Sequence, residues 1–509
     1  MVRRVRWRRS YTTITVVSFW LVMMGILVKR EVLVPHLPPA NSVHSEEAGA
    51  GVRPTDSWMG VYFSDGTKIG YTHSVVRPRP ESIGGGYKAR NVTRIKMSLL
   101  GHPVEIDANV NWTLDGSGRI ADLRFTLDSS DSLFTAVGKV EDGVLRLKVS
   151  TGQAESTSEL PIGDNLLVSS TLSPVMTLPD LEEGVEYTFE MLDPLTLTTR
   201  KAKLKVVAEE SIELAGKSVD TRHIEVDFAG FVTDVWVTDD GEIGKVETPI
   251  GLIMVKELPE QAISGASGAT LPDFASAAAI ASGRIVERPQ DIKRMIVRFD
   301  GINPKTFPVW NGSQRILDEK KSLIEVSTVV PNADQAPRLP ISESDLAEFV
   351  EPGPFVQSDD PRVVEAAREI VGDETDSWRA ALKLLHWVDT EIDNEAVASV
   401  PSAVDVLHAR KGDCNEHTVL YVALARAVGL PAKTDVGLVY YKDGLFCYHA
   451  WPEVHVGEWV RVDPTLGQEV ADATHIKLTE GELYRWTDIL PTIKKLKLEI
   501  IDVDYGVDG

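Results

Sequence analysis

The alternation of apolar and polar residues along the chain changes its period twice. From residue 58 to 258, short segments alternate with a period of two and are separated by turn dipeptides such as Asp65-Gly66 and Asp115-Gly116. This pattern is typical of β-strands joined by tight hairpins. We therefore predict an antiparallel β-rich domain over residues 58–258, built as a sheet, a sandwich or an open barrel. Three roles are considered for this domain: it could hold a ligand, dock a partner or serve as a spacer.

Helical spacing dominates the second half of the chain. Apolar residues recur three or four positions apart in PRVVEAAREIV, which starts at Pro361, and in DSWRAALKLLHWVDTEI, which starts at Asp376. Ser358 and Asp359 are candidate caps of the first helix. In the second helix the expected core residues are Trp378, Ala381, Leu384, Leu385 and Val388.

A third helix and three strands are expected beyond residue 410. CNEHTVLYVALARAV has a broad apolar face and runs from Cys414 to a Gly429-Leu430-Pro431 stop. Strand-like segments follow at 433–441, 445–456 and 459–465, with turns between them. We expect a three-stranded antiparallel meander packed behind a buried helix. Residues 346–509 would thus form an α+β domain, and residues 259–345 a linker with connecting strands.

The N-terminus differs from the rest of the chain. Arginines at positions 3, 4, 6, 8 and 9 precede an uncharged run of 18 residues from Tyr11 to Val28. That length lies at the lower edge of what spans a bilayer as a helix, and flanking arginines hold such an end in the cytoplasm. We predict a single-pass inner-membrane anchor within residues 1–30, a linker at 31–57 and a periplasmic or otherwise extracytoplasmic body. A cleaved signal peptide is the alternative, but no A-x-A site follows the run.

Charge and cysteine content narrow the possible functions. The 509-residue chain has a formal net charge of -23, which argues against a nucleic-acid partner. Its two cysteines, Cys414 and Cys447, cannot form a disulfide framework. Both lie in the predicted helix-and-meander region, which singles out that region for chemistry.

Three residues of this region suit nucleophilic catalysis. Cys414 heads a helix, where free amides and the helix dipole favour a thiolate and would lower its pKa. His449 lies mid-strand and Asp463 near the end of the next strand. A cysteine can attack a carbonyl carbon, a histidine can move the thiol proton, and a carboxylate can orient the imidazole. Pairing about residues 457–458 sets position 449 opposite 466, so a bulge or register shift must bring His449 to Asp463.

Other candidate ligands and donors are weaker. Glu416, His417, His449 and His455 lack the spacing of a known metal motif, so we predict neither a metal nor an organic cofactor. Cys447 is expected to be a free, packed thiol, and a disulfide with Cys414 is the alternative. The backbone N–H of Cys414 is the expected oxyanion donor, and the sequence identifies no second donor.

Three blocks carry a resemblance to a known family. GDCNEHTVLYVALARAVGLPAK, YHAWPEVHV and WVRVDPT resemble the signature blocks of the transglutaminase-like superfamily, a branch of the papain-like fold. The resemblance covers about residues 360 to 470 and implies Cys414 as nucleophile, His449 as its base and Asp463 as the orienting carboxylate. It also implies cysteine peptidase, amidase or protein-crosslinking activity on a protein or peptide substrate.

Together these features predict a membrane-anchored, extracytoplasmic cysteine enzyme that acts on amide bonds through a thioester. A peptidase or amidase is favoured over a crosslinking acyltransferase. A non-catalytic envelope scaffold is the remaining alternative, and an envelope protein is a possible partner of the β-rich domain.

Overall fold

The computed structural model describes residues 54–506 with several gaps. Residues 84, 100, 116–118, 130–131, 163–165, 169–181, 194–196, 229, 266–270, 307–311, 398, 482–487 and 490–491 lie outside the description. The expected anchor at residues 1–30 and most of the linker at 31–57 also lie outside it. Within the described part, no helix has both the length and the apolar character needed to cross a bilayer.

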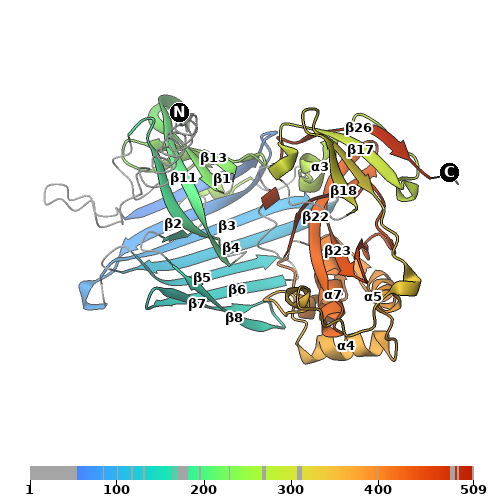
Figure 1. The fold of residues 1–509 in the computed structure, drawn as a ribbon. Coiled ribbons are helices and arrows are strands. Elements are labelled where there is room, and N and C mark those ends of the chain that lie inside the picture. The colour runs from blue at the N-terminus through green and yellow to red at the C-terminus, as the bar shows by residue number, and fades with distance from the viewer. Residues whose placement is uncertain are drawn as a thin grey trace, which may run out of the picture.

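The N-terminal half forms one curled, open sheet of 15 strands rather than a sandwich (Figure 1). Neighbouring strands are antiparallel except β9 and β10, which run parallel. The first and last strands of this sheet in sequence are neighbours in its middle, because β1 pairs with both β2 and β15. The strands are β1 (Thr55–Phe63), β2 (Lys68–Pro78), β3 (Tyr87–Leu99), β4 (His102–Leu114), β5 (Ile120–Ser129), β6 (Ser132–Glu141), β7 (Val144–Ser150), β8 (Glu155–Pro161), β9 (Leu166–Val168), β10 (Glu186–Asp193), β11 (Thr198–Leu214), β12 (Lys217–Phe228), β13 (Phe231–Thr238), β14 (Ile243–Glu247) and β15 (Leu252–Lys256).

One hydrophobic cluster of this sheet includes residues from the C-terminal half. Phe355 and Val400 pack into the cluster that contains Phe134 of β6. The ring centroids of Phe134 and Phe355 are 6.2 Å apart. At the turn between β7 and β8, the Thr151 hydroxyl donates to Ser402 Oγ over 3.1 Å. The two halves of the chain therefore share a packed boundary.

The segment between the two halves supplies a sheet of its own. Its first part holds short elements, α2 (Pro259–Ile263), α3 (Phe274–Ala278) and β16 (Ile280–Ala281). Strands β17 (Arg294–Asp300), β18 (Gln314–Asp318) and β19 (Leu323–Ser327) then form a four-stranded sheet with β26 (Lys497–Asp504) in the order β18-β19-β17-β26. Strands that we expected to connect domains thus pair with the C-terminal strand. Short 3-10 helices lie at Glu81–Ile83, Pro289–Asp291, Pro304–Thr306, Ala333–Gln335 and Ala347–Phe349.

In the described part of the C-terminal half, four helices pack with a second sheet, whose strand order differs from the order along the chain. The helices are α4 (Pro361–Val371), α5 (Ser377–Glu391), α6 (Ala403–Ala409) and α7 (Cys414–Ala427). The α4 cap is Asp360, whose side chain accepts from the Arg362 amide, and not Ser358 or Asp359 as expected. Pro361 at the first helical position explains the shift, because proline suits that position and needs no hydrogen bond there. All five expected core residues of α5 are buried.

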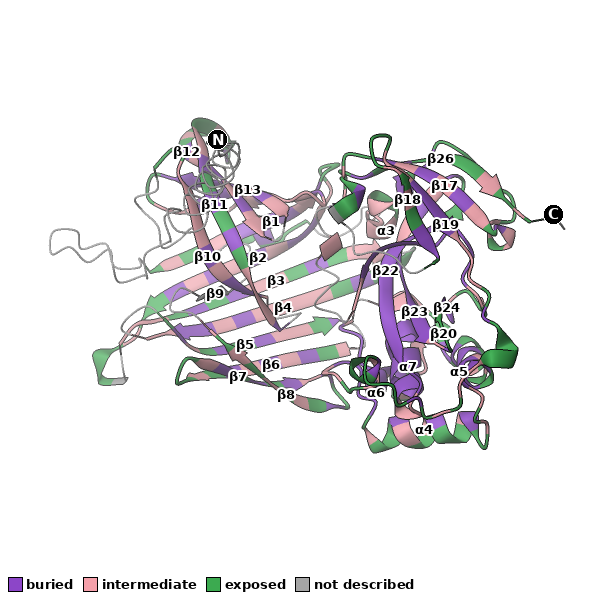
Figure 2. Cartoon of the chain, in the orientation of Figure 1, coloured by how far each residue is buried: buried purple, intermediate pink, exposed green. Residues whose placement is uncertain are grey.

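The second sheet has the order β16-β23-β22-β25, with β24 added to β23. Its strands are β22 (Ala432–Lys442), β23 (Leu445–His455), β24 (Trp459–Arg461) and β25 (Ile476–Glu480). The predicted meander is therefore present, but β25 returns to the far side of β22. Helix α7 packs across β22 and β23, and both are largely buried (Figure 2). A two-residue pair, β20 (Asp393–Asn394) and β21 (Lys411–Gly412), precedes α7.

Candidate active site

Helix α7 begins at Cys414 because the preceding residues stop and cap it. The Asp413 side chain accepts from the Asn415 amide over 2.9 Å, and the Glu416 side chain accepts from the Asp413 amide over 3.0 Å. This reciprocal arrangement is a capping box, which fixes the first turn. A Cβ at Gly412 would lie 2.2 Å from the Glu416 Cβ, so only glycine fits there. The cysteine is thus held at a defined point of the first turn.

The sulfur of Cys414 lies against strand β23. Helix α7 packs against this strand, and the backbone N–H of Ala450, the residue after His449, is near enough to favour the thiolate. Loss of contact with water raises the pKa of the Cys414 thiol well above its ordinary value, and the charge of Asp413 adds to this, while the Ala450 amide opposes it. The expectation that the helix start lowers this pKa is therefore wrong for the isolated thiol. Desolvation and a nearby carboxylate outweigh the helix dipole.

His449 and Asp463 form a direct pair. His449 Nε2 and Asp463 Oδ2 are 2.7 Å apart, and the side chains are 8% and 0% exposed. With Nε2 donating to the carboxylate, the imidazole offers Nδ1 as an acceptor when it is neutral. Within the described residues no hydrogen bond occupies that nitrogen. The pair therefore presents a base on the strand that contacts the Cys414 sulfur.

A register shift and an early end of strand pairing make the pair possible. Glu453 pairs with Arg461, and His455 with Trp459, which is one residue away from the expected register. The strand pairing then stops. The chain leaves the sheet, and the backbone of Asp463 forms two hydrogen bonds with that of Gln468. The other Asp463 oxygen, Oδ1, accepts from the amides of the next turn, at residues 465 and 466. The expected irregularity is thus a turn that aims the carboxylate at His449.

A second histidine, His475, completes the surroundings of Asp463. Its Nε2 lies 3.0 Å from the same Asp463 oxygen that His449 contacts, and its side chain is fully buried. Its Nδ1 lies 3.3 Å from Asp472 Oδ1. The sequence analysis missed this residue, because it lies just before β25 and no motif marks it. Only the return of β25 to β22 brings it to the site.

Opposite charges dominate this cluster. Burial by itself would raise the pKa of Asp463, but the charges and hydrogen bonds of His449 and His475 outweigh it and lower that pKa far below its ordinary value. Burial would likewise lower the pKa of His475, but Asp472 and Asp463 outweigh it and raise the pKa to about 9. Trp451 packs edge-on to His475, with ring centroids 5.1 Å apart. Asp463 is therefore an anion near neutral pH, held between two imidazoles and an apolar wall.

Comparison with known proteins places this site in a family. Residues 364–464 match the model of the transglutaminase-like superfamily. This region is a transglutaminase-like domain. The match includes Cys414, His449 and Asp463 but ends before His475. No curated protein matched the chain.

Two solved structures show limited similarity to the chain. One is a Cytophaga hutchinsonii protein described as a candidate cysteine protease, with 16% identity and a TM-score of 0.31, and the alignment covers 42% of this chain and 89% of that one. The other is a DUF1089 family protein from Pseudomonas aeruginosa, with 16% identity and a TM-score of 0.20, covering 33% and 86%.

Among the described residues, two clusters in or beside the transglutaminase-like domain have side chains close enough for a metal ion. The first is the pair of histidines on Asp463, and the second comprises Asp435, Glu453 and Glu480. In the second cluster Lys477 contacts all three carboxylates, at 2.9, 2.9 and 2.5 Å. In the first, the histidine nitrogens already hydrogen-bond the shared oxygen. We therefore assign no metal to either cluster.

Cys447 is the other thiol of this region. Both cysteines are free, and Cys447 is partly buried opposite Val439. Burial raises the pKa of the Cys447 thiol, and Asp273 adds to the effect. An ordinary packed thiol fits these surroundings, and it provides an internal reference for the reactivity of Cys414.

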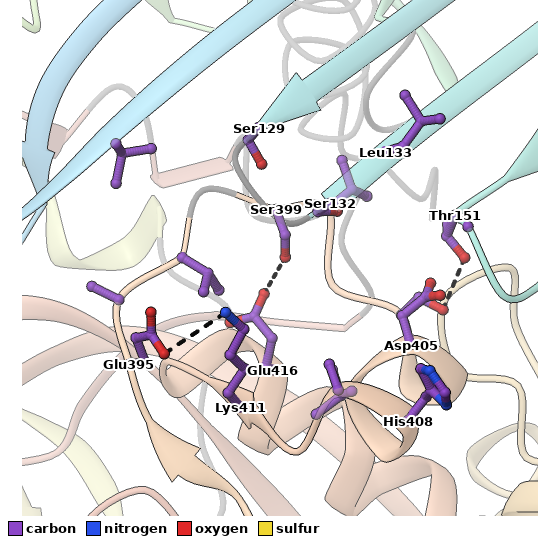
Figure 3. A pocket seen from close by; sticks show the side chains of 18 of the residues that line it. Ser129, Ser132, Leu133, Thr151, Glu395, Ser399, Asp405, His408, Lys411 and Glu416 are labelled. Atoms are coloured by element: carbon purple, nitrogen blue, oxygen red, sulfur yellow. Dashed lines mark hydrogen bonds and ion pairs between the residues drawn. The ribbon is translucent and has the colours of Figure 1, made fainter.

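A cavity of about 500 Å³ separates the transglutaminase-like domain from the large sheet (Figure 3). Ser132 and Leu133 of β6 line one side, and Glu395, Lys411 and Glu416 line the other. In the cavity wall the Ser399 hydroxyl donates to Glu416 over 2.5 Å. The capping residue of α7 thus lines a cavity that the β-rich half helps to form.

Proposed function

We propose that this protein is a membrane-anchored, extracytoplasmic cysteine enzyme that opens amide bonds through a thioester. The observation that carries the proposal is the His449–Asp463 pair, with His449 on β23, the strand against which the helix that begins at Cys414 packs. We assign Cys414 as nucleophile, His449 as general base and acid, and Asp463 as the group that orients His449.

The first step forms the acyl-enzyme. The Cys414 sulfur attacks the carbonyl carbon of an amide while its proton passes to His449 Nδ1. Because the raised pKa keeps the resting thiol protonated, this transfer accompanies attack and does not precede it. The tetrahedral oxyanion is stabilised by the Cys414 backbone N–H at the helix start. His449 then gives the proton to the leaving nitrogen, the C–N bond breaks, and a thioester remains.

The second step releases the acyl group. Water attacks the thioester carbonyl, His449 takes its proton, and the sulfur leaves and is reprotonated. The products are a carboxylic acid and an amine or ammonia, so a peptide bond and a glutamine side chain are both suitable substrates. An amine in place of water would give a crosslink. We favour hydrolysis, that is, a peptidase or amidase.

The cellular placement rests on the first 30 residues. Their arginines and uncharged run support a single-pass inner-membrane anchor with a cytoplasmic N-terminus. The substrate is then a protein or peptide outside the cytoplasm. The large sheet has room to dock an envelope protein, and its shared boundary with the catalytic half would couple that docking to the site.

A non-catalytic envelope scaffold is the second candidate. The raised pKa of the Cys414 thiol favours it, because a thiol without a working base reacts slowly. The two candidates therefore differ in whether His449 activates the sulfur.

Alkylation of the purified full chain by iodoacetamide at neutral pH separates them. Peptide mass spectrometry follows Cys414 and Cys447 in the same sample. We expect Cys414 to react at least about tenfold faster than Cys447, and His449→Ala to slow it by about 10²-fold. His386→Ala, an exposed histidine on α5, is the matched control and should leave the rate unchanged. If Cys414 and Cys447 react equally slowly and His449→Ala does not change the rate at Cys414, the scaffold is favoured.

A product assay distinguishes hydrolysis from transfer. The full chain is incubated with casein peptides and a fluorescent primary amine. New peptide termini or free ammonia without fluorescence in the peptides indicates a hydrolase. Fluorescence incorporated only when Cys414 is intact indicates an acyltransferase.

A further inference from the structure

His475 faces acceptors with both of its ring nitrogens. Nε2 lies 3.0 Å from Asp463 Oδ2, and Nδ1 lies 3.3 Å from Asp472 Oδ1. A neutral imidazole has one N–H and can satisfy only one of them. The ring is fully buried, so water cannot supply the second partner. The geometry therefore favours the doubly protonated, cationic form of His475, in line with the raised pKa of this ring.

Several hydrogen bonds hold His475 and its partner Asp472 in place. Arg461 Nη1 donates to the His475 carbonyl over 2.7 Å. Gln468 holds Asp472 twice, since its side-chain amide donates to the carboxylate over 2.8 Å and its oxygen accepts the Asp472 amide over 2.8 Å. The Gln468 backbone in turn pairs with Asp463. The loop from Asp463 to His475 is thus closed by contacts at both ends.

The charged or titratable groups around His475 come from four parts of the fold. His449 on β23 is the nearest titratable ring, with centroids 5.9 Å apart. The loop contributes two carboxylates and β24 contributes Arg461. The start of helix α7 adds the cap residue Asp413 and the titratable Glu416 on the Cys414 side of the site. The full set is Asp413, Glu416, His449, Arg461, Asp463 and Asp472.

We infer that His475 is a positioning residue for the proposed reaction, which holds the Asp463 carboxylate and shares its charge between two imidazoles. This inference rests on the proposed function of Cys414, His449 and Asp463. His475 touches neither the sulfur nor the position of a substrate. It acts through Asp463, whose oxygen Oδ2 accepts from both rings.

Charge sharing changes the charge that Asp463 presents to His449. Oδ2 of Asp463 accepts from both rings, and the His475 cation offsets part of its negative charge. Without that cation, the full carboxylate charge would face His449. Two unit charges about 6 Å apart at an effective dielectric constant of about 20 interact strongly enough to shift a pH profile by about one unit or more.

The test uses His475→Gln in the full chain. Glutamine can still donate to Asp463 but carries no charge. We measure iodoacetamide alkylation of Cys414 against pH, with Cys447 in the same molecule as reference. Wild-type alkylation should fall on the acid side of the profile, and His475→Gln should move that acid limb upward by about one pH unit with a similar plateau. His386→Gln is the matched control and should not move it.

The outcomes separate this inference from the proposed function. A purely structural role would lower the plateau or the stability without moving the limb. Fast wild-type alkylation with an unmoved limb in His475→Gln overturns the inference and leaves the proposed function standing. Wild-type Cys414 as slow as Cys447 overturns the proposed function, and the inference with it.

A measurement on the wild-type chain covers the case in which His475→Gln does not fold. Nitrogen-15 labelling of the histidines reports how many ring nitrogens of each are protonated. We expect a buried histidine with both ring nitrogens protonated at neutral pH. A spectrum without any buried doubly protonated ring overturns the inference.

Discussion

A protonated thiol describes the resting state of Cys414 better than a preformed thiolate. Partial burial of Cys414 and the nearby charge of Asp413 both oppose a thiolate. His449 donates through Nε2 to Asp463, which leaves Nδ1 to accept the thiol proton. At the residue scale, reactivity thus depends on the tautomer of His449 more than on the helix start.

Replacing the carboxylate tests that dependence. In Asp463→Asn, the oxygen can keep the amides of the following turn, so the amide nitrogen faces His449 Nε2. That donor forces the other tautomer, whose Nδ1 carries a proton and cannot accept one. We expect Cys414 alkylation and turnover to fall by about 10²-fold or more. The exposed Asp373→Asn is the control, and an unchanged rate in Asp463→Asn would contradict the assignment.

Sequence patterns could identify three site residues but not the fourth. Cys414, His449 and Asp463 each stand in a recognisable block, and their order along the chain matches the family. His475 stands in THIKLTE, where nothing distinguishes it from an ordinary residue at a strand start. Its position depends on β25 pairing with β22, a contact between segments that local periodicity does not encode.

At the scale of single elements, the first turn of α7 depends on Glu416. This side chain is buried, and burial together with Asp413 raises its pKa well above the ordinary value, which favours the protonated, uncharged form. Its oxygens accept from the Asp413 amide and from the Ser399 hydroxyl. The residue therefore acts as a neutral cap.

A pair of substitutions checks this view of α7. Glu416→Gln keeps the shape and neutrality, and should change the free energy of unfolding by less than about 0.5 kcal/mol. Glu416→Ala removes the cap, and should cost about 1–2 kcal/mol and slow Cys414 alkylation. Urea unfolding measures both. A large loss in Glu416→Gln would show that the charged form is required.

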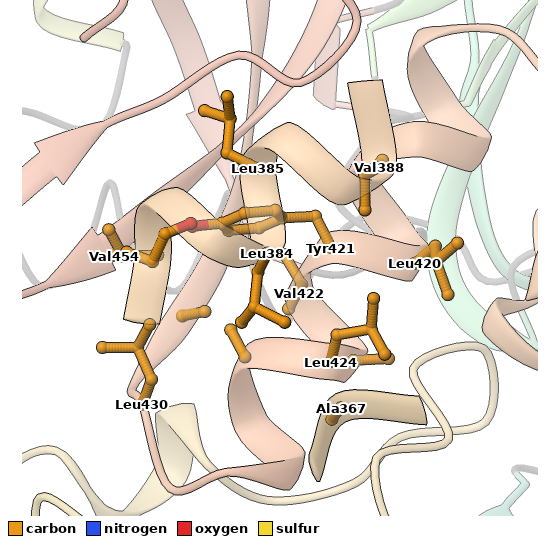
Figure 4. Packing of buried hydrophobic residues seen from close by; sticks show 14 of the residues in the cluster. Ala367, Leu384, Leu385, Val388, Leu420, Tyr421, Val422, Leu424, Leu430 and Val454 are labelled. Atoms are coloured by element: carbon orange, nitrogen blue, oxygen red, sulfur yellow. The ribbon is translucent and has the colours of Figure 1, made fainter. Parts of the chain in front are cut away.

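The helices of the catalytic half share one apolar core. Leu384 of α5 packs fully buried against α7 residues, among them Tyr421 and Leu424 (Figure 4). Leu384→Ala would leave a cavity there and should lower the free energy of unfolding by about 2–5 kcal/mol. The partly exposed Leu382→Ala on the same helix is the control and should cost much less. Equal losses would place Leu384 outside the core.

Periodicity predicted where the helices and strands lie along the chain better than it predicted which strands pair with each other. The spacing of Trp378 and Val388 predicted α5 and its buried face, and the turn at Gly457-Glu458 predicted the hairpin of β23 and β24. The register was one residue off, because the turn is centred on Gly457, whose φ of +102° suits glycine. Pairings between distant segments, such as β17 with β26, leave no trace in local spacing.

At the scale of the whole molecule, the His475 cation links stability to pH. Folding raises its pKa from 6.5 to about 9, so its contribution is complete below about pH 6.5 and is lost as pH rises through about 9. We expect the free energy of unfolding to decline over that interval in wild type and to decline less in His475→Gln. Urea unfolding at about pH 6 and about pH 9.5 measures this difference. The same decline in both chains would contradict it.

The C-terminal strand has a consequence for synthesis. Strand β26 pairs with β17 along its length, and Leu498 and Ile500 enter the core that also holds Leu438 and Ile476 of the catalytic sheet. That core cannot close until Lys497–Asp504 has been synthesised and has paired with β17. The large sheet lies earlier in the chain, so it can assemble while this core still awaits its strand.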